Sequence, residues 1–182
     1  MLYPNGRLLY AVDNQSYHTP AGSGACSALS VLWIGAMHAR PTLAMAGVDA
    51  LGSKEYIERV QHLYETSVHD DDVKAIIEPN GLRLIGNRRT FPLRTADMRT
   101  MLEYMLANLG TYYLTLFDNS DLPSHNMAVY TGTHGYLLFD PNYGLYKADG
   151  VLEFAAKNSE FLAGYYGDIY DQVEWFACVP AR

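Results

Sequence analysis

The chain has 182 residues, of which 49% are hydrophobic and 18% are charged, a composition typical of a globular protein rather than a disordered one. This length suits one domain, so we expect residues 1–182 to form a single unit. The formal net charge of -7 argues against a nucleic-acid partner, because binding to phosphate groups requires clustered positive charge.

No apolar segment has the length of a membrane span. The longest mostly apolar run, Ala28 to Met37, is about half as long as a helix that crosses a bilayer. The N-terminal segment also lacks the basic start and apolar core of a signal peptide. We therefore expect no membrane span and no export through a standard signal.

The first half of the chain is predicted to be mainly helical. A short strand at Leu8 to Val12 leads into a polar loop from Asp13 to Ala25, which glycine residues mark as irregular. Apolar residues then recur at three- and four-residue spacing, the pattern of buried helices. Helices are predicted over Cys26 to Arg40, Ser53 to Thr66 and Asp70 to Ile77.

The second half changes to the alternating pattern of strands. A short strand at Leu82 to Ile85 and a helix from Thr95 to Asn108, stopped by Gly110, come first. Strands are then expected in TYYLTLF, HNMAVYT, YLLFD, LYKA and QVEWFACV, with one helix between Leu152 and Leu162. Helices followed by antiparallel strands indicate an α+β fold.

Cys26 stands between small residues at the start of a predicted buried helix. Unpaired backbone N–H groups and the positive end of the helix dipole favour the thiolate there, which is the nucleophilic form of cysteine. Gly22, Ser23 and Gly24 would let the backbone approach a ligand and offer N–H groups to an oxyanion. The alternative interpretation is a small buried residue that begins a packed helix. Cys178 is interpreted as a core residue, and both cysteines are expected to be free thiols.

A thiol nucleophile needs a base, and among the histidines His125 has the best setting. It begins the predicted strand HNMAVYT, and the next strand, YLLFD, ends at Asp140. A two-residue turn at Gly132-Thr133 would place His125 directly opposite Asp140, with Cβ atoms about 5 Å apart on one face of the sheet. Asp140 would then orient the imidazole that activates Cys26 for acyl transfer. The alternative is a hydrogen bond at the strand end without a catalytic role.

Two charged clusters have simpler interpretations than a binding site. HDDD at His69 to Asp72 indicates a helix start with acidic partners for the helix dipole, rather than a metal site. The second cluster is basic and is interpreted as a solvated face, rather than as a docking surface for an acidic partner or a lipid headgroup. Its members are Arg83, Arg88, Arg89, Arg94 and Arg99.

Three segments together resemble the papain-like cysteine peptidases, and within them the effector peptidases typified by Yersinia outer protein T. The segments are GACSALSVLWI around Cys26, HNMAVY at His125, and FDPNYG, which contains Asp140. In that family a small residue precedes the cysteine, a Leu and a Trp follow it on the helix, and the interval from histidine to aspartate is close to the one found here. The resemblance extends from Gln15 to Gly144, most of the chain.

The resemblance implies a papain-like fold, in which a helical lobe presents Cys26 to a twisted antiparallel sheet that carries His125 and Asp140. It implies a catalytic triad of these three residues that cleaves a narrow set of proteins through an acyl-thiol intermediate, without a cofactor or a metal. Family members are bacterial proteins delivered into host cells, so a host protein is the expected substrate. The long segment before Cys26 departs from the family. Asn14 and Gln15 carry the nearest side-chain amides, which would serve the oxyanion only if this segment bulges back, and Gln15 is the candidate donor.

Two other functions stay open at this point. The same triad could transfer the acyl group to an amine, as a transglutaminase or acyltransferase-like enzyme does, and product formation would then depend on an amine or on acyl-CoA. A deamidase-like enzyme would instead use the triad to hydrolyse a side-chain amide. A catalytically inactive binding module would instead have a Cys26 that reacts with thiol reagents no faster than Cys178 does.

Overall fold

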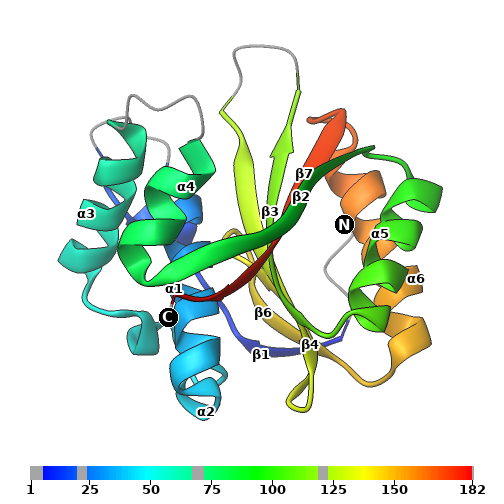
Figure 1. The fold of residues 1–182 in the computed structure, drawn as a ribbon, viewed down its shortest axis with the longest axis horizontal. Helices are drawn as coiled ribbons and strands as arrows, with labels where there is room; N and C mark the ends of the chain where they lie inside the picture. Colours follow the sequence, from blue (N-terminus) through cyan, green and yellow to red (C-terminus); the bar gives the residue numbers. More distant parts are fainter. Residues whose placement is uncertain (1–5, 20–23, 67–71, 119–122, 182) are drawn as a thin grey trace.

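The computed structural model describes residues 6–19, 24–66, 72–118 and 123–181. They form an antiparallel sheet with the strand order β1-β6-β5-β4-β3-β7-β2, and helices cover both of its faces (Figure 1). The strands are β1 (Arg7–Tyr10), β2 (Leu82–Pro92), β3 (Gly110–Phe117), β4 (His125–Gly132), β5 (Gly135–Asp140), β6 (Gly144–Ala148) and β7 (Gln172–Pro180).

The helices fall into two groups on opposite faces of the sheet (Figure 1). One group, with its own hydrophobic core, is α1 (Cys26–Ala39), α2 (Pro41–Ala44), α3 (Lys54–Glu65) and α4 (Asp72–Ile77). The other group, with a second core, is α5 (Thr95–Ala107) and α6 (Val151–Phe161). Short turns are the 3-10 helices η1 (Asn14–Ser16), η2 (Val48–Leu51) and η3 (Glu78–Asn80), and the π-helical turn η4 (Leu162–Tyr166).

The buried helix predicted to begin at Cys26 is confirmed. Helix α1 starts at Cys26 and ends at Ala39, before Pro41, and it packs against both the sheet and helices α3 and α4. Trp33 stacks on Phe139 of β5 with ring centroids 5.3 Å apart. Close packing on most sides fixes the position of the first turn of α1 relative to the sheet.

The edge strand β2 is much longer than the predicted strand at Leu82 to Ile85. It continues to Pro92 as the neighbour of β7, with an irregular register between Ile85 and Arg89. Most of its residues are exposed, because an edge strand needs no apolar alternation to keep its ladder of hydrogen bonds. The basic residues Arg83, Arg88 and Arg89 lie on this exposed strand.

Some residues predicted on apolar helix faces are exposed. Ile57 and Val60 of α3 are buried, but Leu63 is 58% exposed. Leu109, which follows the helix predicted from Thr95 to Asn108, lies beyond the end of α5 and is 65% exposed. The part of the predicted helix at Asp70 that precedes α4 lies outside the described residues.

The predicted register of the β4–β5 hairpin is wrong by two residues. Gly132 pairs with Gly135, so the turn is Thr133 and His134 rather than Gly132 and Thr133. The reason is that Gly135, and not Gly132, supplies the positive φ, at +116°. Asp140 therefore lies diagonally from His125 instead of directly opposite. A shift of two residues keeps both side chains on the same face of the sheet, so the two still meet.

Within the described ranges, no helix combines the length and the apolar character needed to cross a bilayer. The mixture of helices and one antiparallel sheet confirms the predicted α+β class. Strands β1 and β2, which come before and after the first group of helices, begin close to the two short strands predicted at Leu8 and Leu82.

Candidate active site

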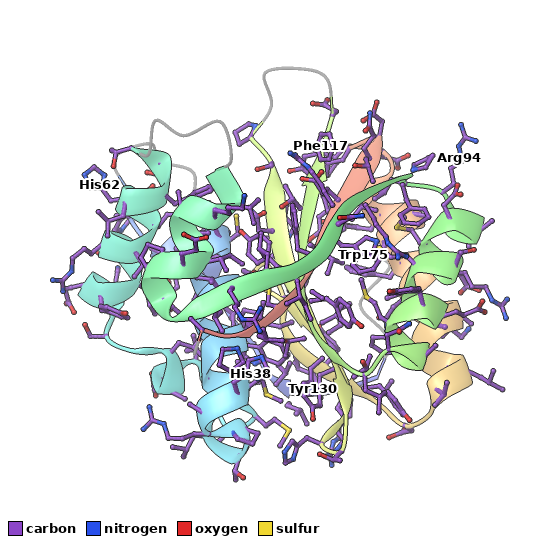
Figure 2. All side chains as sticks on the ribbon, in the orientation of Figure 1. His38, His62, Arg94, Phe117, Tyr130 and Trp175 are labelled. Atoms are coloured by element: carbon purple, nitrogen blue, oxygen red, sulfur yellow. The ribbon has the colours of Figure 1, made fainter. Side chains whose placement is uncertain are left out.

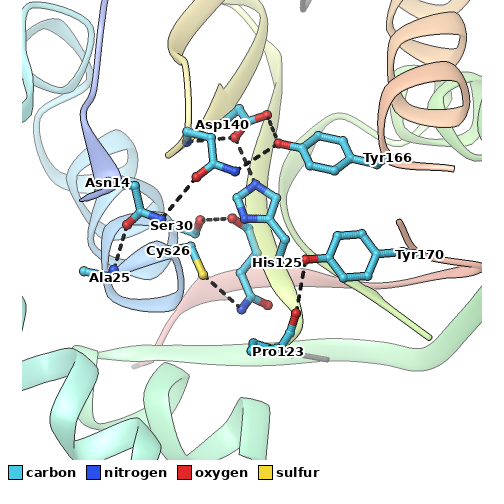
Figure 3. A network of polar contacts seen from close by, with 11 residues as sticks. Asn14, Ala25, Cys26, Ser30, Pro123, His125, Asp140, Tyr166 and Tyr170 are labelled. Carbon is cyan, nitrogen blue, oxygen red and sulfur yellow. Dashed lines mark hydrogen bonds and ion pairs between the residues drawn. The ribbon is translucent and has the colours of Figure 1, made fainter. Parts of the chain in front are cut away.

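The start of α1 is bound to the start of β4. The Ser30 hydroxyl donates a hydrogen bond to the backbone carbonyl of Asn126 over 3.1 Å. In return, the Asn126 side-chain N–H group contacts the Cys26 Sγ atom at 3.7 Å and the Ser27 hydroxyl at 2.7 Å. These contacts hold Cys26, the first residue of α1, beside His125, the first residue of β4 (Figure 3).

His125 and Asp140 form a buried pair. Their Nε2 and Oδ1 atoms are 3.0 Å apart, and the residues are 4% and 0% exposed. In Figure 3 the imidazole lies between the carboxylate of Asp140 and the sulfur of Cys26. Because Nε2 engages Asp140, the other ring nitrogen, Nδ1, is the one left for Cys26.

The surroundings favour an ion pair between Cys26 and His125. Burial raises the pKa of the Cys26 thiol, but hydrogen bonding to His125, the charge of His125 and the N–H groups of Asn126 outweigh it and bring the pKa below its ordinary value. Burial lowers the pKa of His125, yet the charge and hydrogen bond of Asp140, together with Cys26, raise that pKa to about 10. The thiolate–imidazolium form is therefore stabilised at neutral pH.

Cys178 has the opposite setting. It lies in the core on β7, where burial raises the pKa of its thiol to about 12, against a smaller lowering by the Tyr113 backbone. Its interpretation as a structural residue therefore agrees with its environment, and it provides an internal reference for the reactivity of Cys26.

Asp140 is held by two more groups that the sequence did not single out. The backbone N–H of Asn142 donates to Oδ1 over 2.9 Å, and the Tyr166 hydroxyl donates to Oδ2 over 2.8 Å. The Tyr166 ring also stacks on the His125 ring, with centroids 5.0 Å apart and planes at 21°. Both oxygens of the buried carboxylate are thus engaged.

Asn14, rather than Gln15, lies at the site, beside the residue that precedes Cys26. The Asn14 Oδ1 atom accepts a hydrogen bond from the Ala25 backbone N–H over 2.7 Å, and its Nδ2 atom donates to the Asn142 side chain over 3.2 Å. Gly24 permits this approach, because it has φ +76° and a Cβ there would lie 2.8 Å from the Asn14 amide. Gln15 is exposed to solvent.

The two other residues predicted to offer N–H groups, Gly22 and Ser23, lie outside the described residues.

Among the described histidines, only His125 lies beside Cys26. His62 points away from the sheet on the outer side of α3, and His38 lies near the other end of α1, where its Nε2 atom is 2.8 Å from the Thr111 hydroxyl (Figure 2). His18 is exposed, and His134 is in the β4–β5 turn. The described residues also contain no group of three or more His, Cys, Asp or Glu side chains placed to hold a metal ion.

Comparisons with known proteins identify the fold and the family of the chain. The family model of a peptidase family described as Yersinia/Haemophilus virulence surface antigen matches residues 9–168. The crystal structure of the Pseudomonas avirulence protein AvrPphB is similar, with a TM-score of 0.71 at 17% identity over 94% of this chain and 97% of that one. No curated protein matches the chain.

A second similar structure is PatoxP, a cysteine protease-like domain of the Photorhabdus asymbiotica toxin PaTox. Its TM-score is 0.57 at 15% identity, over 96% of this chain and 54% of that one. Both structures share the fold, which confirms the predicted papain-like α+β architecture. Because the family model spans most of the sequence, the chain belongs to the Yersinia/Haemophilus virulence surface antigen family of cysteine peptidase-like bacterial effectors.

Proposed function

We propose that this protein is a cysteine endopeptidase in which Cys26 is the nucleophile, His125 the general base and acid, and Asp140 the orienting carboxylate. One observation carries the proposal: the imidazole of His125 lies between the Cys26 sulfur and the Asp140 carboxylate, with Nε2 and Oδ1 3.0 Å apart. A thiol, a base within reach and a third group that orients the base make up the arrangement of nucleophilic acyl transfer.

The reaction follows from the protonation states of this pair. The Cys26 thiolate attacks the carbonyl carbon of the peptide bond, and the carbonyl electron pair moves to the oxygen. The C–N bond then breaks, and the leaving amine takes the proton of the His125 imidazolium. Water, deprotonated by His125, attacks the acyl-thiol, and breakage of the C–S bond releases the acid and restores the thiolate–imidazolium pair.

Two donors are available for the oxyanion that forms on the way. As the first residue of α1, Cys26 has a backbone N–H without an acceptor inside the helix. The Asn14 amide nitrogen carries two hydrogens, and one of them is used by Asn142. We propose that the second serves the oxyanion, so that Asn14 takes the role expected of Gln15.

The Asn14→Asp change tests this assignment. The aspartate keeps the oxygen that accepts from Ala25 but removes the N–H donors and adds a negative charge near the oxyanion, so kcat is expected to fall about 10²–10³-fold. Gln15→Glu makes the equivalent change on an exposed side chain, so it is the matched control and is expected to keep kcat close to that of the native protein. A large fall in kcat for Gln15→Glu, with Asn14→Asp close to the native protein, would reverse the assignment.

The substrate class is a protein rather than a small molecule. Members of a family of virulence effectors act where host proteins are available, so we propose delivery into a host cell and a host protein as the target. The net charge of -7 favours a basic target segment over an acidic one.

New protein N-termini are the direct readout of this function. Host-cell extract is incubated with the native protein or with Cys26→Ser, and new N-termini are identified by mass spectrometry, with and without an added primary amine. Recurrent cleavage sites that require Cys26 are the expected result. Products that carry the added amine, without new N-termini, would instead assign an acyl transferase, and no Cys26-dependent product would favour an inactive binding module.

A further inference from the structure

A π-helical turn extends α6 and brings Tyr166 to the candidate active site. Helix α6 ends at Phe161, and the π turn continues from Leu162 to Tyr166. The turn depends on the glycine that follows, because a Cβ at Gly167 would lie 2.1 Å from the Ala163 carbonyl oxygen. π-helical turns are rare, and those inserted into α-helices are frequently found at functional sites.

Tyr166 touches both members of the His125–Asp140 pair (Figure 3). It is 2% exposed, its hydroxyl donates to Oδ2 of Asp140 over 2.8 Å, and its ring lies against the imidazole of His125 at 5.0 Å between centroids. The hydroxyl also accepts a hydrogen bond from the Asn142 side chain over 3.3 Å. A buried phenol with both a ring contact and two hydrogen bonds in one cluster has little freedom to move.

We propose that Tyr166 is a positioning residue of the catalytic centre, which fixes the Asp140 carboxylate and the His125 ring in the arrangement that maintains the Cys26 thiolate. This inference rests on the proposed function. The hydroxyl of Tyr166 holds Oδ2, so the carboxylate cannot rotate and Oδ1 stays aimed at Nε2. The stacked ring restricts rotation of the imidazole.

The same network reaches the backbone of Ala25, the residue before the nucleophile. Asn142 links the Tyr166 hydroxyl to Asn14, and Asn14 accepts from the backbone N–H of Ala25. A change at Tyr166 therefore acts on both sides of the site, through Asp140 on the base and through Asn14 on the segment that leads into Cys26.

The pH dependence of iodoacetamide alkylation at Cys26 measures this role without a known substrate. Tyr166→Phe keeps the ring and removes only the hydroxyl, so it weakens the hold on Asp140 and hence the stabilisation of the imidazolium. The inflection of the alkylation profile is expected to move up by about one pH unit, which is about tenfold slower labelling below the inflection. Tyr165→Phe, the same change in the half-buried neighbouring residue, is expected to keep the native profile.

Cys178 reports whether each variant is folded. It lies in the core, where burial raises the pKa of its thiol to about 12, so it stays unlabelled in the native fold. If Cys178 becomes labelled in Tyr166→Phe, the Asn142→Ala variant is used to test the role of Tyr166 instead. Asn142 is exposed, and its replacement removes a hydrogen bond that its side chain donates to the Tyr166 hydroxyl. It is expected to shift the inflection upward by less than Tyr166→Phe does. The role of Tyr166 is overturned if the folded Tyr166→Phe protein, or Asn142→Ala in its place, keeps the native inflection.

Failure of the proposed function gives a different result in the same assay. In that case the native protein itself lacks rapid labelling at low pH, whatever residue 166 is. Rapid labelling of the native protein together with an unshifted Tyr166→Phe profile contradicts only the positioning role.

Discussion

Replacing Cys26 by alanine is expected to abolish cleavage, with kcat lowered about 10⁶-fold to the residual rate that binding and the oxyanion donors sustain. No other thiol can take over, because Cys178 lies in the core and burial raises its pKa to about 12. The change should leave the fold intact, since the thiol is a small group whose hydrogen-bonding partners are His125 and Asn126. Cleavage at the sites found in host extract, followed with a peptide that spans one site, measures the effect.

Cys178→Ala is the matched control for this prediction. It removes the other buried thiol of the chain and is expected to keep the native kcat, with stability lower by about 1 kcal/mol because a core contact is lost. Cleavage that survives in Cys26→Ala, or that disappears in Cys178→Ala while the protein remains folded, would contradict the assignment of the nucleophile.

Asp140→Asn has the second largest expected effect, a fall in kcat of about 10⁴-fold, as in other triads where the carboxylate becomes an amide. A neutral amide cannot stabilise the imidazolium, and the raised pKa of His125, about 10 in the native protein, falls as the charge of Asp140 is lost. The amide N–H group would also face the donors of Asn142 and Tyr166. One unsatisfied buried donor lowers stability by about 1–3 kcal/mol.

The effect of Asp140→Asn on kcat is separated from its effect on stability by thermal unfolding measured beside the kinetics. Asp149→Asn, an exposed residue that follows β6, removes the same charge and is expected to change neither quantity. Native kcat in a folded Asp140→Asn protein would show that the carboxylate has no part in orienting the base.

The His125–Asp140 pair could be predicted from the sequence even though the predicted hairpin register was wrong. Alternation along β4 and β5 decides which face of the sheet a side chain occupies, and a slip of two residues in the turn preserves that face. The same alternation puts Asn126 on the opposite face, toward α1, where it contacts Cys26. The role of Asn126 could therefore have been predicted from its place directly after His125.

Neither the choice of Asn14 over Gln15 nor the role of Tyr166 could be predicted in this way. Asn14 is placed by its hydrogen bonds with Ala25 and Asn142, and contacts of this kind between distant residues leave no periodic signal. Tyr166 reaches the site because a π turn follows α6, whereas the predicted helix ends at Leu162 and leaves the position of Tyr166 undefined. The length of β2 was missed because an exposed edge strand has no apolar alternation.

The measurement that tests the central claim most directly is the rate of iodoacetamide alkylation at Cys26 against pH, in the native protein and in His125→Ala. Because His125 brings the pKa of Cys26 below its ordinary value, native Cys26 is expected to label rapidly well below pH 8, about the range in which an ordinary thiol stays protonated. The inflection should move up sharply in His125→Ala. Slow labelling of native Cys26, with a profile that His125→Ala leaves unchanged, would contradict the account and favour a binding module.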